Sequence, residues 1–168
     1  MNTEPIVIEQ AFKVPASRIW SAITRKEEMK LWYFDLPEFK AVPGFQFQFS
    51  GGPTPERQYL HLCEIMEVIP DRKLAYTWRY DGYPGVSEVV FELTGNGDEI
   101  LLRLVHLGLE TFPEDNADLS KQNFQIGWKS IVSGSLKEYL EPSDHWLIKI
   151  EKDRAGRLHP FTKTKLTN

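Results

Sequence analysis

The 168-residue sequence has a single cysteine, Cys63, and so no pair that could form an internal disulfide or a cysteine-rich metal site. No apolar run is long enough to span a bilayer. The first ten residues, MNTEPIVIEQ, lack the basic stretch and following apolar run of a signal peptide. We therefore expect a cytoplasmic protein that does not associate with membranes.

An excess of basic charge is also missing, since the net charge is -4 and the pI is near 5.6. A nucleic-acid surface needs a basic field that neutralises phosphates, so we expect no nucleic-acid partner. The charge is unevenly spread along the chain. Residues 143–168 contain six Lys or Arg and three Asp or Glu, so this segment is basic and residues 1–142 are acidic.

Motifs for metal, nucleotide and hydrolase chemistry are absent too. The four histidines, His61, His106, His145 and His159, form no HxH or HExxH motif. GxGxxG, GxxxxGK and GxSxG do not occur. Cys63 has no activating base beside it in the sequence, and we expect a small buried apolar residue there. The sequence thus predicts no metal, no cofactor and no enzyme activity.

Charged residues in the predicted strands give little support for catalysis. Glu88 and Arg103 fall on adjacent strands, each opposite the apolar side, and we expect them to form a pair on the solvent side. Glu64 and Glu67 have opposite parity in one strand, so regular pleating would separate them. A β-bulge would bring both to one face.

What the sequence does contain is a series of segments with strand-like alternation. A first strand is predicted over residues 5–14, and two short helices follow it, near residues 15–23 and 26–31. Composition predicts a loop over residues 51–55. Turn signals separate the remaining strands, which favours an antiparallel meander. These strands are expected over residues 45–50, 59–69, 73–80, 87–93 and 100–107.

One long amphipathic helix is predicted over residues 120–141. Its apolar residues recur at the spacing of a single helix face: Phe124, Trp128, Ile131, Val132, Leu136, Tyr139 and Leu140. Ser120 is suited to cap its N-terminus, and Pro142 ends it. Gly127 is expected to allow close approach of the sheet. The sequence therefore predicts an α+β fold in which a curved antiparallel sheet of about six strands surrounds this helix.

The order of several motifs resembles the START-like superfamily (SRPBCC, Bet v 1-like). The first strand, VPASRIWSAIT and a short helix ending near Leu31-Trp32 resemble its opening. CEIMEVIPDRKLAYTW, SEVVFELTGNGDEILLRLVH and Gly127-Trp128 resemble one branch, the homologues of the C-terminal domain of the activator of the 90-kDa heat shock protein ATPase. The resemblance covers about residues 5–141. It implies the helix-grip fold, with residues 1–142 as the domain and residues 143–168 as a C-terminal extension.

An aromatic set provides the strongest functional signal. Rings from the sheet and from the last helix should converge in the wedge between them, where an apolar wall with a few polar groups would form a small-molecule cavity. The alternative is that the rings fill the wedge completely. The residues predicted to line such a cavity are Trp32, Phe34, Phe47, Tyr59, Tyr76, Trp78, His106, Phe124, Trp128 and Ile131.

His106 has two open interpretations. It follows Leu102 and Leu104 on one strand face, so it could offer a polar group to a ligand near neutral pH. Alternatively, it is a core-edge histidine that hydrogen-bonds to the backbone or to a neighbouring strand.

Two classes of function remain open. In the first, the protein binds a small hydrophobic or amphipathic molecule between the sheet and the last helix. In the second, it regulates a chaperone or another protein partner, as the resemblance to stress-response proteins implies. The extension contributes a further hypothesis, because Trp146, Ile148 and Ile150 make full disorder unattractive. We expect this basic segment to dock on the acidic domain or to mediate a homodimer.

Overall fold

A computed structural model describes residues 3–142. The extension at 143–168 and its hypothetical role in a homodimer lie outside the described residues. The elements in chain order are β1 (Ile6–Phe12), α1 (Ala16–Thr24), α2 (Lys26–Trp32), β2 (Gln46–Thr54), β3 (Arg57–Ile69), β4 (Lys73–Tyr80), β5 (Ser87–Asn96), β6 (Glu99–Leu107), the short 3-10 turns η1 (Leu109–Thr111) and η2 (Ala117–Leu119), α3 (Lys121–Lys129), the π-helical η3 (Ser130–Leu136) and α4 (Lys137–Leu140).

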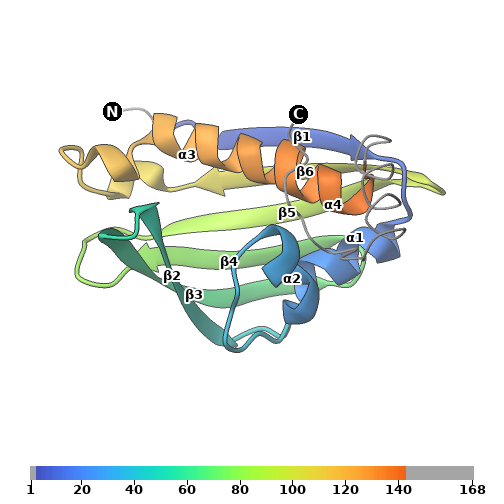
Figure 1. Ribbon diagram of the computed structural model, residues 1–168, viewed down its shortest axis with the longest axis horizontal. Coiled ribbons are helices and arrows are strands. Elements are labelled where there is room, and N and C mark those ends of the chain that lie inside the picture. Colours follow the sequence, from blue (N-terminus) through green and yellow to red (C-terminus); the bar gives the residue numbers. More distant parts are fainter. Residues whose placement is uncertain (1–2, 143–168) are drawn as a thin grey trace, which may run out of the picture.

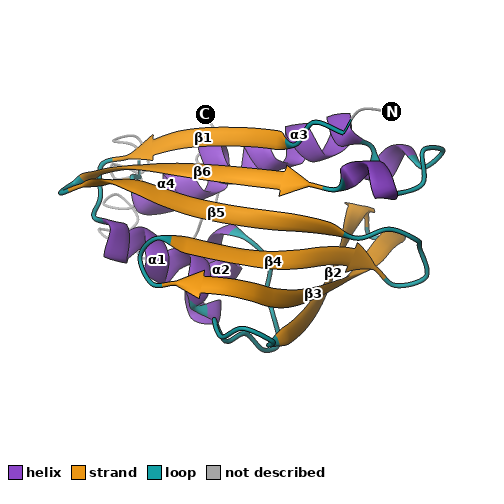
Figure 2. Ribbon diagram, turned by 180° about the vertical axis from the view of Figure 1, so that it is seen from behind, coloured by secondary structure: helices purple, strands orange, loops and turns teal. Residues whose placement is uncertain are grey.

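The six strands form one antiparallel sheet in the order β1-β6-β5-β4-β3-β2. The chain crosses from the β1 edge to the β2 edge through α1 and α2. Figure 1 shows the last helix lying along β1 and β6, with α1 and α2 on the same side of the sheet. Figure 2, from behind, shows the opposite face of the sheet without helices. The predicted α+β helix-grip fold is confirmed.

The inner face of the sheet carries the alternating apolar residues. In β6, Leu102 and Leu104 are fully buried, and in β5 the inward residues are Val89, Phe91 and Leu93. On the outer face Arg103 forms ion pairs, but its partners are Glu92 at 3.7 Å and Glu9 at 3.5 Å. The predicted pairing with Glu88 is wrong, because the strand register places Glu88 opposite Leu107.

Two irregularities bend the strands at one edge of the sheet. In β3 the register shifts between Ile65 and Glu67, so the pairing partners of Glu64 and Glu67 are Thr77 and Ala75, both on the outer face. Because of this bulge, Glu64 and Glu67 lie on the same face of the sheet, although their spacing along the chain would place them on opposite faces of a regular strand.

The hairpin between β2 and β3 differs from the predicted loop. β2 continues through Thr54, with a register shift between Gly51 and Thr54. A Cβ atom at Gly52 would lie 1.9 Å from the carbonyl oxygen of Arg57. The glycines and prolines of residues 51–55 therefore allow a tight, bulged hairpin where composition alone predicted an open loop.

The last helix is continuous from Lys121 to Leu140 and contains a π-helical segment in the middle. The Ser120 hydroxyl accepts a hydrogen bond from the Asn123 amide, as expected for the N-cap. The residues that face the sheet recur every four positions: Phe124, Trp128, Val132, Leu136 and Leu140. A strict four-residue repeat drifts around an α-helix of 3.6 residues per turn, and the wider π turn reduces this drift. No helix among residues 3–142 is long and apolar enough to cross a membrane.

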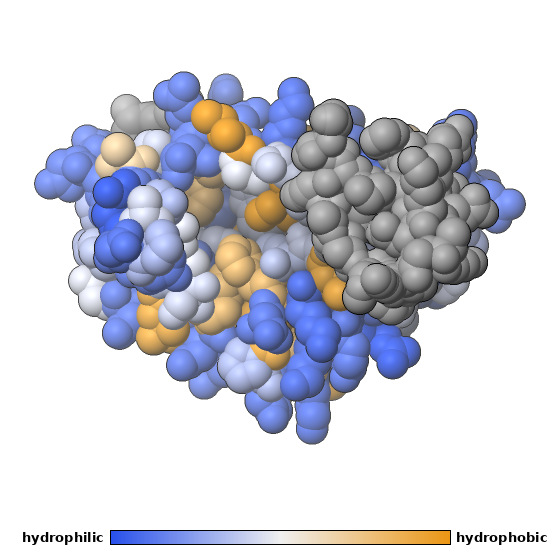
Figure 3. Space-filling view, in the orientation of Figure 1, coloured by the Kyte–Doolittle hydropathy of each residue, from blue (hydrophilic) through white to orange (hydrophobic). Residues whose placement is uncertain are grey.

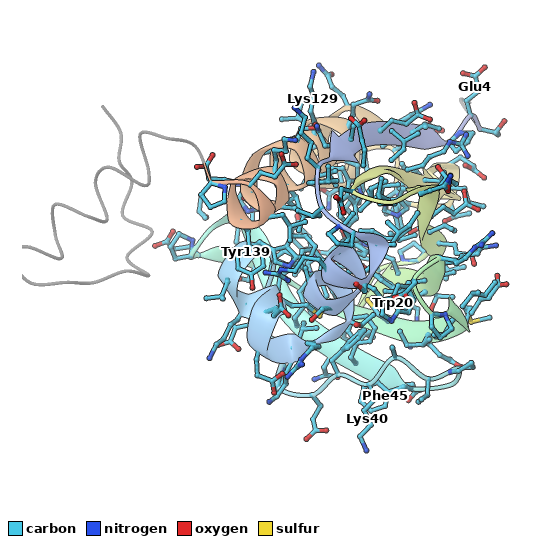
Figure 4. All side chains as sticks on the ribbon, turned by 90° about the vertical axis from the view of Figure 1, so that its right-hand side faces the viewer. Glu4, Trp20, Lys40, Phe45, Lys129 and Tyr139 are labelled. Atoms are coloured by element: carbon cyan, nitrogen blue, oxygen red, sulfur yellow. The ribbon has the colours of Figure 1, made fainter. Side chains whose placement is uncertain are left out.

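A polar cluster fastens the end of this helix to α1 and α2. The Tyr139 hydroxyl donates to the Glu28 carboxylate at 2.7 Å, and Arg18 donates to the same oxygen at 2.6 Å. The Ser21 hydroxyl donates to the other oxygen of Glu28. Figure 4 shows Tyr139 in the space between the last helix and the two N-terminal helices. These hydrogen bonds hold the pKa of Glu28 below its usual value although partial burial opposes them.

Candidate functional site

A hollow of about 330 Å³ lies between the first half of the last helix and strands β2–β4. Figure 3 shows apolar side chains at the bottom of a depression in this face of the molecule. Six of the ten predicted cavity residues line it: Phe34, Tyr59, Trp78, Phe124, Trp128 and Ile131. Each of its two sides thus contributes aromatic rings, as the sequence predicted. The role of these residues in binding stays a prediction.

The other four predicted residues lie outside the lining. The Trp32 indole donates to the carbonyl oxygen of Ala22 and packs within the core. Phe47 contacts Tyr76 edge to face, and the Tyr76 hydroxyl lies 3.1 Å from that of Tyr33. These side chains belong to the packed core. The wedge is therefore filled by side chains where these residues lie, and it is open at the hollow.

His106, the fourth of these residues, is completely buried behind Trp128. Its Nδ1 accepts a hydrogen bond from the Trp128 indole Nε1 at 2.9 Å, which leaves the proton on Nε2. Nε2 donates to the Ser87 hydroxyl at 2.7 Å, and that hydroxyl donates to the carbonyl oxygen of Trp78 at 3.0 Å. Burial lowers the pKa of His106 to about 3, so the ring is neutral at pH 7. The interpretation as a hydrogen-bonded core histidine fits this arrangement.

The lining also contains residues that the sequence did not single out. His61 lies on the floor of the hollow, and its ring stacks on Phe49 at 4.4 Å between centroids. Tyr80 lies beside it, and its hydroxyl accepts from the Trp78 indole at 2.9 Å. The alternation of β3 put His61 on the same face as Tyr59 and Cys63, and that parity was the available signal.

A salt bridge joins β3 to η2 beside the hollow, which Asp118 lines. Arg57 donates two hydrogen bonds to the Asp118 carboxylate, at 2.7 and 3.1 Å, and the Tyr59 hydroxyl donates a third at 2.7 Å. The hydrogen bonds from Arg57 and then from Tyr59 lower the pKa of Asp118. The side-chain Nδ2 of Asn123 donates to the backbone oxygen of Asp118 and links η2 to α3.

Gly127 is part of the open wall. A Cβ atom at this position would meet no atom within 4 Å, and the residue lines the hollow. The expectation that Gly127 permits close approach of the sheet is therefore wrong. Its missing side chain leaves open space at the wall of the hollow, beside Ile126, which is 61% exposed.

A second hollow, of about 410 Å³, lies on the outer face of β2–β4. Its lining is mostly polar and includes Gln46, Gln48, Thr77 and Arg79. The inner hollow combines aromatic walls with few polar groups, which is typical of small-molecule sites. We therefore consider the inner hollow to be the candidate site.

The described residues offer few groups for covalent or metal chemistry. Within residues 3–142, no three His, Cys, Asp or Glu side chains are grouped so that they could hold a metal ion. Cys63 is buried, as expected, and burial raises the pKa of its thiol. A thiol of this kind is a poor nucleophile because the reactive form is the thiolate.

A curved antiparallel sheet that grips a long C-terminal helix, with a hollow between them, defines the class of START-like helix-grip domains. The chain belongs to the family described as Activator of Hsp90 ATPase homolog 1-like protein, whose family model matches residues 13–141. This match confirms the family resemblance that the motifs indicated. Among curated proteins, no match to the chain is found.

Solved structures share the fold at low sequence identity. DynU16, a protein in the dynemicin biosynthetic locus, is 20% identical with a TM-score of 0.67, and the match covers 84% of this chain and 48% of DynU16. The chain thus spans about half of that protein. CalU16 from Micromonospora echinospora is 24% identical with a TM-score of 0.62, covering 92% of this chain and 85% of CalU16. Aha1 from Colwellia psychrerythraea, solved as a dimer, is 18% identical with a TM-score of 0.59, covering 82% and 96%.

Proposed function

We propose that the protein binds a small hydrophobic or amphipathic molecule in the hollow between the last helix and strands β2–β4. The observation that carries this proposal is the aromatic lining of an open space of about 330 Å³ beside an otherwise packed core. Binding sites for small molecules are commonly of this size and composition. Exposed apolar surface supports the proposal too, because Ile126 and Ile131 line the hollow and neither side chain is fully buried.

Binding without chemical conversion fits the polar groups of the lining. The Asp118 carboxylate is hydrogen-bonded to Arg57 and Tyr59, and the thiol of Cys63 is buried and lies outside the lining of this hollow. DynU16 is a protein in the dynemicin biosynthetic locus, which supports a small organic molecule as the ligand of this hollow. We accordingly infer a carrier or sensor role. Because no conversion is expected, a bound molecule should have the same mass in mass spectrometry before and after incubation with the protein.

The glycines of the last helix provide a direct test of the site. Gly127 faces the hollow, whereas Gly134 is exposed on the π-helical segment, and a Cβ at either position would meet no atom within 4 Å. A Gly127→Leu variant should fill the hollow and lose co-purified ligand in native mass spectrometry. The matched Gly134→Leu variant should retain it. Equal ligand occupancy in the two variants would refute binding at this site.

A second candidate function is interaction with a protein partner, such as a chaperone or a second copy of the chain. An apolar row crosses the outer face of the sheet in register, through Ala75, Val90, Val105 and Val7. The family description and the dimeric Aha1 structure support this class. Light scattering of the full chain and of a deletion of residues 143–168 tests the homodimer. A monomeric mass for both would rule it out.

A further inference from the structure

His61 presents one ring nitrogen that is already occupied. Its Nδ1 lies 3.0 Å from the carbonyl oxygen of Tyr59 and 3.2 Å from that of Phe49. Carbonyl oxygens accept and cannot donate, so Nδ1 must carry the proton. The neutral imidazole then has its lone pair on Nε2. This tautomer is the opposite of the one that the hydrogen bonds impose on His106.

Nε2 of His61 has no hydrogen-bond partner among residues 3–142, although the side chain is only 6% exposed. Every fully buried side-chain nitrogen and oxygen in this part of the chain has a partner. Nε2 must therefore keep some accessible surface, and His61 is one of the residues that line the hollow. The adjacent ring carbon Cε1 would lie 3.4 Å from a Cβ at Gly51, another lining residue.

The aromatic surroundings fix the direction of this acceptor. The ring of His61 stacks on Phe49 with 14° between the planes and meets Trp78 edge to face at 4.9 Å. A flip of the ring would replace the Nδ1 hydrogen bonds by carbon–oxygen contacts. Burial lowers the pKa of His61 to about 4, so the acceptor is not protonated at pH 7. The other ionisable groups in the lining are Tyr80, Tyr59 and Asp118, which is paired with Arg57.

We propose that the ligand of this hollow is an aromatic molecule with a hydroxyl group that donates a hydrogen bond to Nε2 of His61. This inference rests on the proposed binding function and specifies its ligand class. The flat walls formed by Phe34, Trp78 and Trp128 suit a planar ring. A ligand without a donor would cover Nε2 and leave it unsatisfied, which weakens binding about tenfold or more.

Two probes of nearly equal shape test the proposal: 2-naphthol, which has the hydroxyl donor, and 2-methoxynaphthalene, which lacks it. Calorimetric titration of the full chain at pH 7 should give about tenfold tighter binding of 2-naphthol. In a His61→Phe variant, which keeps an aromatic ring on Phe49, the two probes should bind within about twofold of each other. Binding of 2-methoxynaphthalene should become tighter than in the wild type, because the variant has no ring nitrogen that this probe would leave unsatisfied.

Equal binding of both probes by the wild type, or a preference that survives in His61→Phe, would overturn the role of His61 and leave the hollow as a general hydrophobic site. Failure of the wild type to bind either probe would overturn the aromatic site as a whole. Nitrogen-15 NMR of the wild type provides a test without a variant. Nε2 should be unprotonated in the free protein, and its signal should shift with 2-naphthol and not with 2-methoxynaphthalene. A protonated Nε2 in the free protein would contradict the proposal.

Discussion

The indole Nε1 of Trp128 donates a hydrogen bond to Nδ1 of His106 across 2.9 Å, inside the protein core. This contact joins the last helix to β6, and the chain of donors continues through Ser87 on β5 to a backbone oxygen on β4. This hydrogen bond fixes the orientation of Trp128, which is one of the residues that line the hollow. A buried hydrogen bond specifies the position of the wall more narrowly than apolar packing can.

Replacing Trp128 with Phe should destabilise the protein by more than the loss of ring size explains. The variant removes the donor and leaves the buried Nδ1 of His106 without a partner, at a cost of about 1–3 kcal/mol. Trp20→Phe is the matched control, because Trp20 is half-buried and has no side-chain hydrogen bond within residues 3–142. Urea unfolding measures both. Equal losses of unfolding free energy would show that the hydrogen bond contributes nothing.

Stability should fall as the pH decreases from about 6.5 to 5. His106 and His61 have pKa values lowered to about 3 and about 4 by burial, whereas an unfolded histidine has a pKa of about 6.5. Within this window the unfolded state binds more protons, so acid favours unfolding, by up to about 1.4 kcal/mol per pH unit for each histidine. Above pH 6.5 this contribution to stability is fully present.

The carboxylates with lowered pKa values, Glu28, Asp118 and Glu141, titrate mainly below this window. Urea midpoints at pH 7, 6 and 5 therefore report chiefly on the histidines. The His61→Phe variant should lose about half of the slope. A wild-type midpoint that is constant from pH 7 to 5 would contradict the buried neutral state of both rings.

Two glycine substitutions should have opposite effects on stability. Gly127→Ala adds a methyl group where no atom lies within 4 Å and replaces glycine inside a helix, which should stabilise by about 0.5–1 kcal/mol. Gly52→Ala places a Cβ 1.9 Å from the Arg57 carbonyl oxygen, which should destabilise by about 1–3 kcal/mol. The melting temperature of each variant, compared with that of the wild type, measures both effects. A lower melting temperature for Gly127→Ala would mean that the space beside Gly127 is occupied in solution.

Tyr139→Phe should loosen the end of the last helix. The hydroxyl donates to the Glu28 carboxylate at 2.7 Å in a partly exposed cluster, and its loss should cost about 1 kcal/mol. For a protein of this size the melting temperature should fall by about 2–4 °C. Tyr83→Phe is a suitable control, because Tyr83 is 41% exposed and its hydroxyl has no hydrogen-bond partner in the described part of the chain. A similar fall in both variants would refute the role of the cluster.

Periodicity along the chain predicted the strands well because one face of this sheet is buried. The alternation of Leu74, Tyr76, Trp78 and Tyr80 predicted β4 at the residues where it occurs. Composition was a poorer guide at the hairpin of residues 51–55, since it cannot reveal that a glycine lies against a backbone oxygen. The register between neighbouring strands is also a property of the tertiary structure, and it places Arg103 beside Glu9 and Glu92.

The candidate site was predictable in part. Spacing on the last helix identified Phe124, Trp128 and Ile131, because residues three and four apart share a face. It did not identify His61, whose importance depends on two carbonyl oxygens and on the absence of a third partner within residues 3–142. The strand register decides which hydrogen-bond partners meet across the sheet. Alternation along the sequence predicts only the face of the sheet on which a side chain lies.

The sequence by itself determined the order of the six strands and the main helices, the apolar face of several strands, the apolar stripe of the last helix and the family. Each of these depends on local periodicity or on motifs that the chain carries in order. The tertiary structure alone decided where the aromatic rings fill the wedge and where they leave it open. It also decided which nitrogen of each buried histidine carries the proton, because that depends on partners brought together from distant strands and from the helix.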